Sequence, residues 1–438
     1  MIARHGPARI LIVSDAWTPQ VNGVVRTLTA VTAELHAMGH IVEVIGPDRF
    51  RTMPCPTYPE IGLALLPGRR LVGLIEAFRP DALHIATEGP LGLAARAWAC
   101  RRGLHFTTAY HTRFPEYLAA RLGLMGRSGI THAMTSRFLK WFHAPSQGVM
   151  VSTDSMREEL AMGGFVRLRA WPRGVDLSLF HPALRQEAPD FTDLPRPLFV
   201  YIGRVAVEKN ISAFLDLDLP GTKLVVGGGP QLRALQRAYS NVRFVGPRSG
   251  RELARAFASA DVLVFPSLTD TFGLVVIEAL ASGAPVAAFP VTGPRDILRG
   301  VDGVAGVTDP DLRAACLRAL TLERAACRAH AQAFTWRASA EAFLDNLVPI
   351  HGAASVTRQG AGVERVLASG PGAPGGDGAD ADCPSPVVAG RLETPPGGAA
   401  GRNGAVEARS AITLKAACRP ERAAMGTPEP GCTPPPAR

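Results

Sequence analysis

The stretch from Val262 to Val291 constrains the fold more than any other part of the chain. It begins with an apolar run, 262–265, which predicts a buried parallel strand, and a polar loop follows. Helical spacing of apolar residues over 272–282, with Gly283 at the C-terminal cap, predicts a helix before a second buried strand, 285–289. Strand–loop–helix–strand units of this kind build open α/β sheets, which bind anions and nucleotides at the carboxyl ends of their strands.

Two acids stand out within this stretch. Asp270 lies in the loop, where a carboxylate can simply cap the following helix. Glu278 comes eight residues later, about two turns into the helix, and is flanked by apolar residues. Because buried acids are rarely left without a partner, Glu278 is the stronger candidate for binding a ligand. A carboxylate there suits two vicinal hydroxyls, such as those of a ribose.

The spacing of these acids resembles the acid-x7-acid signature of the retaining glycosyltransferases of family 4, which have the GT-B fold. The resemblance implies that Asp270 contacts the sugar of a nucleotide-sugar donor and that Glu278 binds its ribose. It also implies that the backbone amides of Phe272, Gly273 and Leu274 bind the sugar. The first acid is usually Glu in the family, so the shorter Asp270 is a departure from its pattern.

Two cations follow a strand predicted at 198–203. Arg204 and Lys209 come at the carboxyl end of that strand, just before a helix, where positive charge suits a diphosphate. Such cations would stabilise the leaving group as the glycosidic bond breaks. Two surface cations alone are a weak signal, but an Arg and a Lys take this role in the family that the chain resembles.

The first part of the chain adds two candidates. Gly23 stands between a predicted strand, 8–15, and a predicted helix, 24–38, where the backbone can approach a phosphate closely, although loops need glycine anyway. His111 follows a strand at the usual ligand edge of an α/β sheet, or is merely satisfied by local hydrogen bonds. The surrounding segments, DAWTPQVNGVVRTL and YHTRFPEYL, resemble family segments near the donor diphosphate and the donor sugar.

The same resemblance organises the chain into domains. It extends over about residues 8–350, and the segment that starts RGVD at Arg173 looks like the family's inter-domain junction. We therefore expect an α/β chain with two Rossmann-like, doubly wound domains facing across a cleft, over 1–176 and 177–350. The final helix, within 322–343, should pack back on the first domain.

Other segments carry weaker expectations. Residues 48–71 and 292–295 are predicted to form loops. Residues 351–438 are rich in Gly, Pro and Ala and have no aromatic residue, so they cannot bury enough apolar surface to offset chain entropy. We expect a disordered tail there.

A possible metal motif is present but badly placed. Asp216-x-Asp218 matches the D-x-D of the other glycosyltransferase fold, yet it does not follow a strand, and the resembled family generally needs no metal. We expect no metal and no cofactor. The co-substrate implied by the resemblance is a nucleotide sugar, GDP-mannose or a UDP-sugar.

Net charge is +9, and the excess lies in the first domain. Residues 1–175 carry 20 Lys and Arg against 12 Asp and Glu, whereas residues 176–350 carry 18 of each. A basic half favours an anionic partner, such as a phosphate-bearing substrate, an acidic lipid or nucleic acid, unless it is an ordinary solvated surface. A predicted helix, 131–143, is amphipathic and either lies on a membrane surface or buries its apolar face in the domain.

Location follows from what the chain lacks. No apolar run approaches the ~20 residues that span a bilayer, and no signal peptide is visible. The seven cysteines show neither a disulfide nor a zinc pattern. We expect a cytoplasmic protein, and the basic first domain favours peripheral attachment to the inner leaflet of the membrane.

The sequence thus predicts a retaining, metal-independent enzyme that moves a hexose of the mannose or glucose type from a nucleotide diphosphate to a lipid or glycan acceptor. Because no nucleophile is evident in the first domain, the family implies front-face attack with the departing phosphate as base. One alternative is a nucleotide-sugar epimerase or hydrolase on the same fold. Another is a non-catalytic binder of anionic surfaces or nucleic acid, although the chain lacks the basic clusters interleaved with aromatics that nucleic acid requires.

Overall fold

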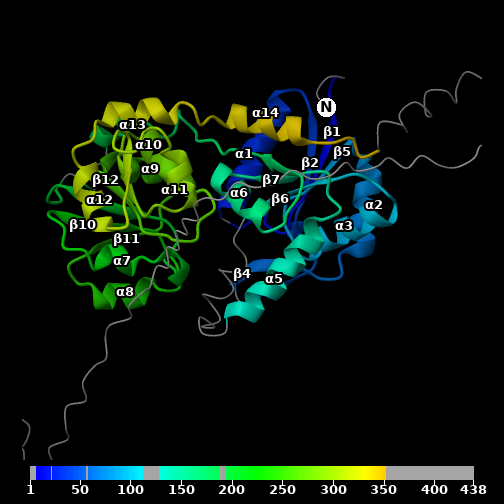
Figure 1. The fold of residues 1–438 in the computed structure, drawn as a ribbon, viewed down its shortest axis with the longest axis horizontal. Coiled ribbons are helices and arrows are strands. Elements are labelled where there is room, and N and C mark those ends of the chain that lie inside the picture. The colour runs from blue at the N-terminus through cyan, green and yellow to red at the C-terminus, as the bar shows by residue number, and fades with distance from the viewer. Residues whose placement is uncertain are drawn as a thin grey trace, which may run out of the picture. The chain divides into compact units, whose positions relative to one another are not determined.

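Two parallel β-sheets form the framework of the described chain (Figure 1). The computed structural model describes residues 6–20, 22–55, 58–111, 128–187, 191 and 193–351, with only the backbone described for 58–61 and 128–132. The first sheet has the order β2 (Ile41–Ile45), β1 (Arg9–Val13), β5 (Ala82–Ile85), β6 (Thr107–Tyr110), β7 (Val149–Val151) and β8 (Leu168–Ala170). The second has the order β11 (Arg243–Gly246), β10 (Thr222–Val226), β9 (Leu198–Ile202), β12 (Val262–Phe265), β13 (Val286–Ala288) and β14 (Gly306–Thr308).

Each sheet is doubly wound. The strand order changes direction between β1 and β5 in the first sheet and between β9 and β12 in the second. Nucleotides bind at such switch points, outside the carboxyl ends of the strands. The central strands are apolar because helices cover both faces of a parallel sheet, and every residue of β9 and β12 is buried. The sequence located β12 at its observed bounds.

Helices surround both sheets. The first lobe, built on β1–β8, has α1 (Gly23–Ala37), α2 (Gly68–Phe78), α3 (Pro90–Arg101), α5 (Ser128–His143) and α6 (Asp154–Met162). The second lobe, built on β9–β14, has α7 (Ser212–Leu215), α8 (Leu232–Ala238), α9 (Gly250–Ser259), α10 (Leu274–Ala281), α11 (Thr292–Ile297), α12 (Leu312–Ala319) and α13 (Arg324–Ala331). Short 3-10 turns occupy η2 (Pro47–Arg49), η3 (Pro182–Glu187) and η5 (Val207–Lys209).

The last helix, α14 (Trp336–Asn346), returns to the first lobe and lies beside α1 (Figure 1). Its Phe343 is fully buried, with its ring centroid 4.9 Å from that of Trp171. Thr335 caps the helix by accepting a hydrogen bond from the backbone amide of Ala338. The chain of the second lobe therefore completes the core of the first.

Three sequence expectations were wrong in detail. The expected loop at 48–71 contains an antiparallel hairpin of β3 (Thr52–Cys55) and β4 (Tyr58–Ala64) and the start of α2. The sequence of the hairpin shows no alternation of polar and apolar residues, because β3 is largely exposed and contains a proline. The expected loop at 292–295 is the first turn of α11, where a proline is tolerated because first-turn amides have no helical acceptor.

The expected single helix over 322–343 is α13 followed by α14. The helix is interrupted between them because the carbonyl of Phe334 accepts a hydrogen bond from the backbone amide of Val175, 3.0 Å away. Thr335 then caps the next helix. The amphipathic helix α5 buries Leu139 and Phe142 but leaves Phe138 36% exposed. One face of α5 thus enters the core while another remains open to solvent.

Some expectations fall outside the described residues. These are the proposed tail beyond residue 351 and the segment 112–127 that follows His111. Within the described ranges, no helix has the length and apolarity needed to cross a membrane. The four cysteines described, Cys55, Cys100, Cys316 and Cys327, form no disulfide.

Candidate active site

The loop between β12 and α10, residues 266–273, is called the acid loop here. The side-chain amide of Asn210 donates to the carbonyl of Pro266 at 3.1 Å, which ties the loop to the end of η5. Asp270 pairs with Lys209, with 2.5 Å between Oδ1 and Nζ. Two predicted site residues thus meet at the carboxyl edge of the second sheet. Asp270 is not the helix cap, a position that Gly273 occupies.

Gly273 leads into α10 with a φ of +87°, a left-handed conformation that glycine adopts without steric cost. A Cβ at this position would lie 3.0 Å from the ring of Phe265. No described side chain caps α10. The amide of Val276 donates to the carbonyl of Gly273 at 2.9 Å, whereas that of Leu274 has no acceptor among the described residues and remains available to an anion. Phe272 precedes them at the same edge. The residues predicted to bind the donor sugar through their amides therefore lie at a helix N-terminus.

Glu278 is buried, with 3% exposure, one helical turn inside α10. Its Oε1 accepts a hydrogen bond from the guanidinium of Arg26, while its Oε2 has no hydrogen-bond partner among the described residues. Burial raises the pKa of this carboxyl above its usual value, and the charge of Arg26 opposes that shift. One oxygen of this buried carboxylate thus has no hydrogen-bond partner among the described residues.

Arg26 belongs to α1 of the first lobe, so the ion pair with Glu278 joins the two lobes. Gly23 lies one turn earlier, and a Cβ built on it would be 3.7 Å from Cδ1 of Leu274. The N-termini of α1 and α10 therefore meet. Sequence reasoning missed Arg26, although its position three residues after Gly23 puts both on one face of the helix.

His111 lies against the acid loop. Its carbonyl oxygen accepts a hydrogen bond from the hydroxyl of Thr271 at 2.8 Å. Its Nδ1 accepts from Nη2 of Arg173 at 3.3 Å, and its Nε2 is buried with no partner among the described residues. Burial, and then the positive charge of Arg173, lower the pKa of His111 well below its usual value. The imidazole is therefore neutral near pH 7.

Arg204 directly follows β9, the strand beside β12. Its carbonyl accepts a hydrogen bond from the hydroxyl of Tyr201 at 2.7 Å, and its side chain is half-buried. Because β9 and β12 are parallel neighbours, the backbone of Arg204 lies at the same sheet edge as the acid loop.

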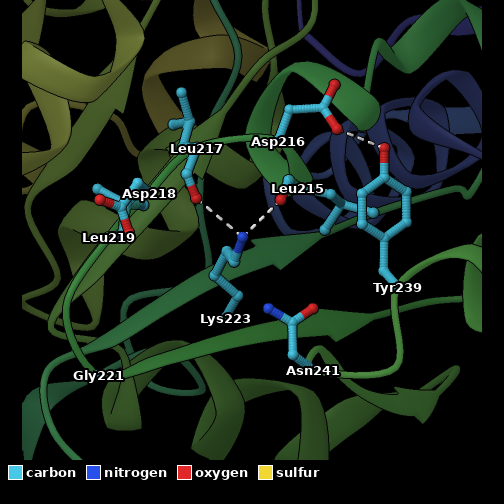
Figure 2. A pocket seen from close by; sticks show the side chains of 9 residues that line it. All are labelled: Leu215, Asp216, Leu217, Asp218, Leu219, Gly221, Lys223, Tyr239 and Asn241. Atoms are coloured by element: carbon cyan, nitrogen blue, oxygen red, sulfur yellow. Dashed lines mark hydrogen bonds between the residues drawn. The ribbon is translucent and has the colours of Figure 1, made fainter.

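The D-x-D sequence, Asp216 to Asp218, precedes β10 and so lies at the amino ends of the strands of the second sheet, away from the acid loop (Figure 2). Asp216 accepts a hydrogen bond from the hydroxyl of Tyr239 at 2.6 Å. Lys223 donates to the carbonyls of Leu215 and Leu217 in the same small pocket. In the described part of the chain, no group of three or more His, Cys, Asp or Glu residues is placed to hold a metal ion.

Two family models match the chain. The model described as Glycosyltransferase Family 4 matches residues 21–179, and the model described as Glycosyl transferases group 1 matches residues 196–322. These matches fall on the first and second lobes, respectively. The second includes the acid loop and Glu278.

Three known proteins illustrate the likeness. A GDP-mannose-dependent alpha-mannosyltransferase from Mycobacterium tuberculosis is 33% identical over 319 residues, which cover 66% of this chain and 81% of the relative. An alpha-monoglucosyldiacylglycerol synthase from Streptococcus pneumoniae is 27% identical over 318 residues, which cover 64% of this chain and 70% of the relative. The structure of sucrose-phosphate synthase from Thermosynechococcus elongatus has a TM-score of 0.60 and 22% identity, covering 80% of this chain and 98% of that chain.

The structural likeness shows the fold, and the sequence relatives give the class of protein. Relatives of this kind transfer sugars, so they lend no support to an epimerase, a hydrolase or a non-catalytic binder. The expected two-domain GT-B architecture is confirmed. The chain belongs to glycosyltransferase family 4, and it is a glycosyltransferase.

Proposed function

We propose that this glycosyltransferase is a retaining, metal-independent mannosyltransferase that takes its sugar from GDP-mannose. Transfer of a hexose from a nucleotide sugar to a lipid or glycan acceptor is the activity that its relatives support. The observation that carries the proposal is the buried Glu278, whose Oε2 has no partner among the described residues and which lies one turn into a helix with no side-chain cap. A carboxylate next to an anion site fits a ribose attached to a diphosphate.

In this proposal the donor lies where α1 and α10 meet. Glu278 accepts a hydrogen bond from a ribose hydroxyl through Oε2. Arg204 and Lys209 bind the diphosphate, assisted by the N-terminus of α10. Asp270, which already orients Lys209, contacts the sugar, as do the amides of Phe272, Gly273 and Leu274. Gly23 leaves room for the diphosphate because it has no side chain.

Leaving-group stabilisation dominates the proposed mechanism. The bond between the anomeric carbon and the phosphate oxygen breaks as negative charge grows on the diphosphate. Two cations and a helix dipole can offset this charge without a metal ion. The acceptor hydroxyl attacks on the face that the phosphate leaves, and the departing phosphate takes its proton. No step requires a nucleophile from the first lobe.

We further propose a lipid acceptor and a location at the cytoplasmic face of the inner membrane. Helix α5 exposes three large apolar side chains, those of Met134, Phe138 and Trp141. Arg137 and Lys140 lie on the same helix, which combines apolar and basic groups as interfacial helices do. Sedimentation with anionic and neutral vesicles at low salt tests this point, and equal binding to both would contradict it.

Calorimetric titration with GDP-mannose, UDP-glucose and their free nucleotides tests the donor. We expect GDP-mannose to bind most tightly and to yield an α-linked product by NMR. EDTA should leave the rate unchanged. Preference for a UDP-sugar would contradict the choice of donor, a β-linked product would contradict retention, and a loss of rate in EDTA would contradict metal independence.

A further inference from the structure

Arg173 is a buried cation whose described partners carry no negative charge. Its side chain is enclosed, with 5% of the residue exposed. Nη1 donates to the carbonyl of Trp171 at 2.7 Å, and the guanidinium carbon lies 4.2 Å from the centroid of the same indole. Burial lowers the pKa of Arg173 to about 9, which still leaves it charged near pH 7. Burying a charge is costly, so its position calls for an explanation.

A third contact of Arg173, with His111, explains why this charge is buried. Its Nη2 lies 3.3 Å from Nδ1 of His111. A guanidinium has donors only, so Nδ1 must present its lone pair. The single proton of the neutral ring must then be on Nε2. A proton on Nδ1 would place two N–H groups head to head, and an imidazolium would do the same beside a positive charge.

We infer that Arg173 is a positioning residue that fixes His111 as a neutral Nε2–H donor directed at a sugar hydroxyl. The Nε2 atom is buried and has no partner among the described residues. The carbonyl of His111 is bonded to Thr271, next to Asp270, so the imidazole is anchored beside the acid loop. This inference rests on the proposed function for its ligand, but the tautomer itself can be observed without one.

The assignment excludes a role for His111 as general base. A base needs a free lone pair on the nitrogen that faces the substrate, and here that nitrogen carries the proton. Two other buried histidines, His84 and His143, add to the influences that keep His111 uncharged. The geometry therefore agrees with a reaction in which the departing phosphate takes the acceptor's proton, while His111 only donates a hydrogen bond.

Long-range proton–nitrogen NMR spectra of the full chain labelled with ¹⁵N-histidine test the tautomer, without any nucleotide present. The variant His111→Gln identifies the signals of His111 by their loss. We expect a protonated Nε2 and an unprotonated Nδ1 that do not change between pH 8 and pH 6. A proton on Nδ1, or conversion to imidazolium near pH 6.5, would overturn the inference. If His111→Gln does not fold, His111→Leu identifies the same signals by their loss.

Variants of Arg173 test the positioning role. Arg173→Met should release the tautomer and lower kcat about tenfold to a hundredfold, whereas Arg173→Lys, which keeps a donor-only cation, should restore the tautomer and part of kcat. Arg169→Met is a matched control, because Arg169 donates only to the carbonyls of Asn346 and Gln147 in the described chain, and it should leave the tautomer unchanged. An unchanged tautomer in Arg173→Met would contradict the role.

Measuring sugar transfer alongside the tautomer distinguishes a failure of this inference from a failure of the proposed function. If the tautomer is as stated but no nucleotide sugar is consumed, the proposed function fails and the arrangement of Arg173 and His111 stands. If mannose is transferred while the tautomer is wrong, only the inference fails. His111→Gln, which keeps an N–H at the far end of its side chain, should retain more activity than His111→Leu, and equal losses would count against donation to the sugar.

Discussion

At the scale of single residues, Glu278 shows how a sequence reveals a site. A buried acid in the middle of an apolar helix calls for a partner, and the structure places Glu278 in the interior with one oxygen unpaired among the described residues. What the sequence could not give was Arg26, its partner from the other lobe. Arg26 is 252 positions away, so no local pattern connects the two.

Replacing Glu278 with Gln should weaken binding of the free nucleotide about tenfold to a hundredfold, because a charged acceptor of ribose hydroxyls is lost. The melting temperature should not fall. Burial raises the pKa of Glu278, so its charged form lowers stability near neutral pH, and a neutral amide removes that cost. Calorimetric titration and thermal unfolding measure both effects.

Glu341→Gln is the control for this variant. Glu341 is exposed on α14 and pairs with Arg337, so its loss should change neither nucleotide binding nor melting temperature by much. Unchanged nucleotide affinity in Glu278→Gln would remove the ribose contact from the proposed site.

Acid should destabilise the protein through His84. This side chain is fully buried, its Nδ1 lies 2.9 Å from the hydroxyl of Thr107, and burial lowers its pKa to about 3. A lowered histidine pKa contributes stability above the unfolded value, near 6.5, and loses it as pH falls toward 3. Between pH 7 and pH 4 this one group should remove on the order of 3 kcal/mol from the free energy of unfolding.

Urea unfolding of wild type and His84→Gln at both pH values measures that loss. The variant should be less stable at pH 7, because ring packing against Phe343 is lost, and the gap should shrink at pH 4. The comparison is needed because Asp15 acts in the opposite direction. Burial raises the pKa of Asp15 to about 6, so its contribution is present at low pH and lost as pH rises. A gap of the same size at both pH values would contradict the role of His84.

At the scale of elements, the acid loop depends on how α10 begins. Gly273 has a positive φ, and the uncapped amides that follow it form the proposed anion site. The sequence predicted this helix from the spacing of its apolar residues and the end of the helix from Gly283. It also placed Asp270 before the helix and Glu278 within it. It did not predict that Asp270 faces Lys209, which is a contact between two different strand ends.

Gly273→Ala should lower stability by about 1–2 kcal/mol, because a side chain costs this much in the left-handed region. It should also reduce turnover at least tenfold by shifting the first turn of α10 away from the ring of Phe265. Gly300→Ala is a matched control, with a φ of +78° and no atom within 4 Å of the added Cβ. It should lose similar stability but keep its activity, and equal turnover losses in the two variants would show that α10 has no special role.

At the scale of the whole molecule, α14 links the lobes. It follows the second lobe in sequence, yet Ala340, Phe343 and Leu344 lie in the core of the first lobe. Beyond it, the amide of Ile350 donates to the carbonyl of Asp81, which ties the end of the described chain to the first sheet. Sequence similarity implied that this helix would cross back, but the break before it was missed.

A chain ended after residue 351 should therefore keep its fold and activity, whereas one ended after residue 335 should not. Removing α14 exposes the first-lobe core around Trp171 and Phe343, and loss of a buried phenylalanine alone costs about 3–5 kcal/mol. Circular dichroism and tryptophan fluorescence during urea unfolding measure the effect. If the shorter chain unfolds at the same urea concentration as the longer one, α14 is not part of the first-lobe core.

The sequence by itself determined the α/β class, the bounds of strands such as β12, and the residues Glu278, Asp270, Lys209 and His111 as candidates. The α/β class, the bounds of β12 and the choice of Glu278 follow from the spacing of apolar and polar residues within short windows, whereas the resemblance to family 4 made Asp270, Lys209 and His111 site candidates. Only the tertiary structure decided that Arg26 meets Glu278, that Arg173 faces His111 and that α14 enters the first lobe. Such contacts join segments that are distant in sequence, and they depend on how strands and helices pack within and between the two lobes, which no short-range pattern records.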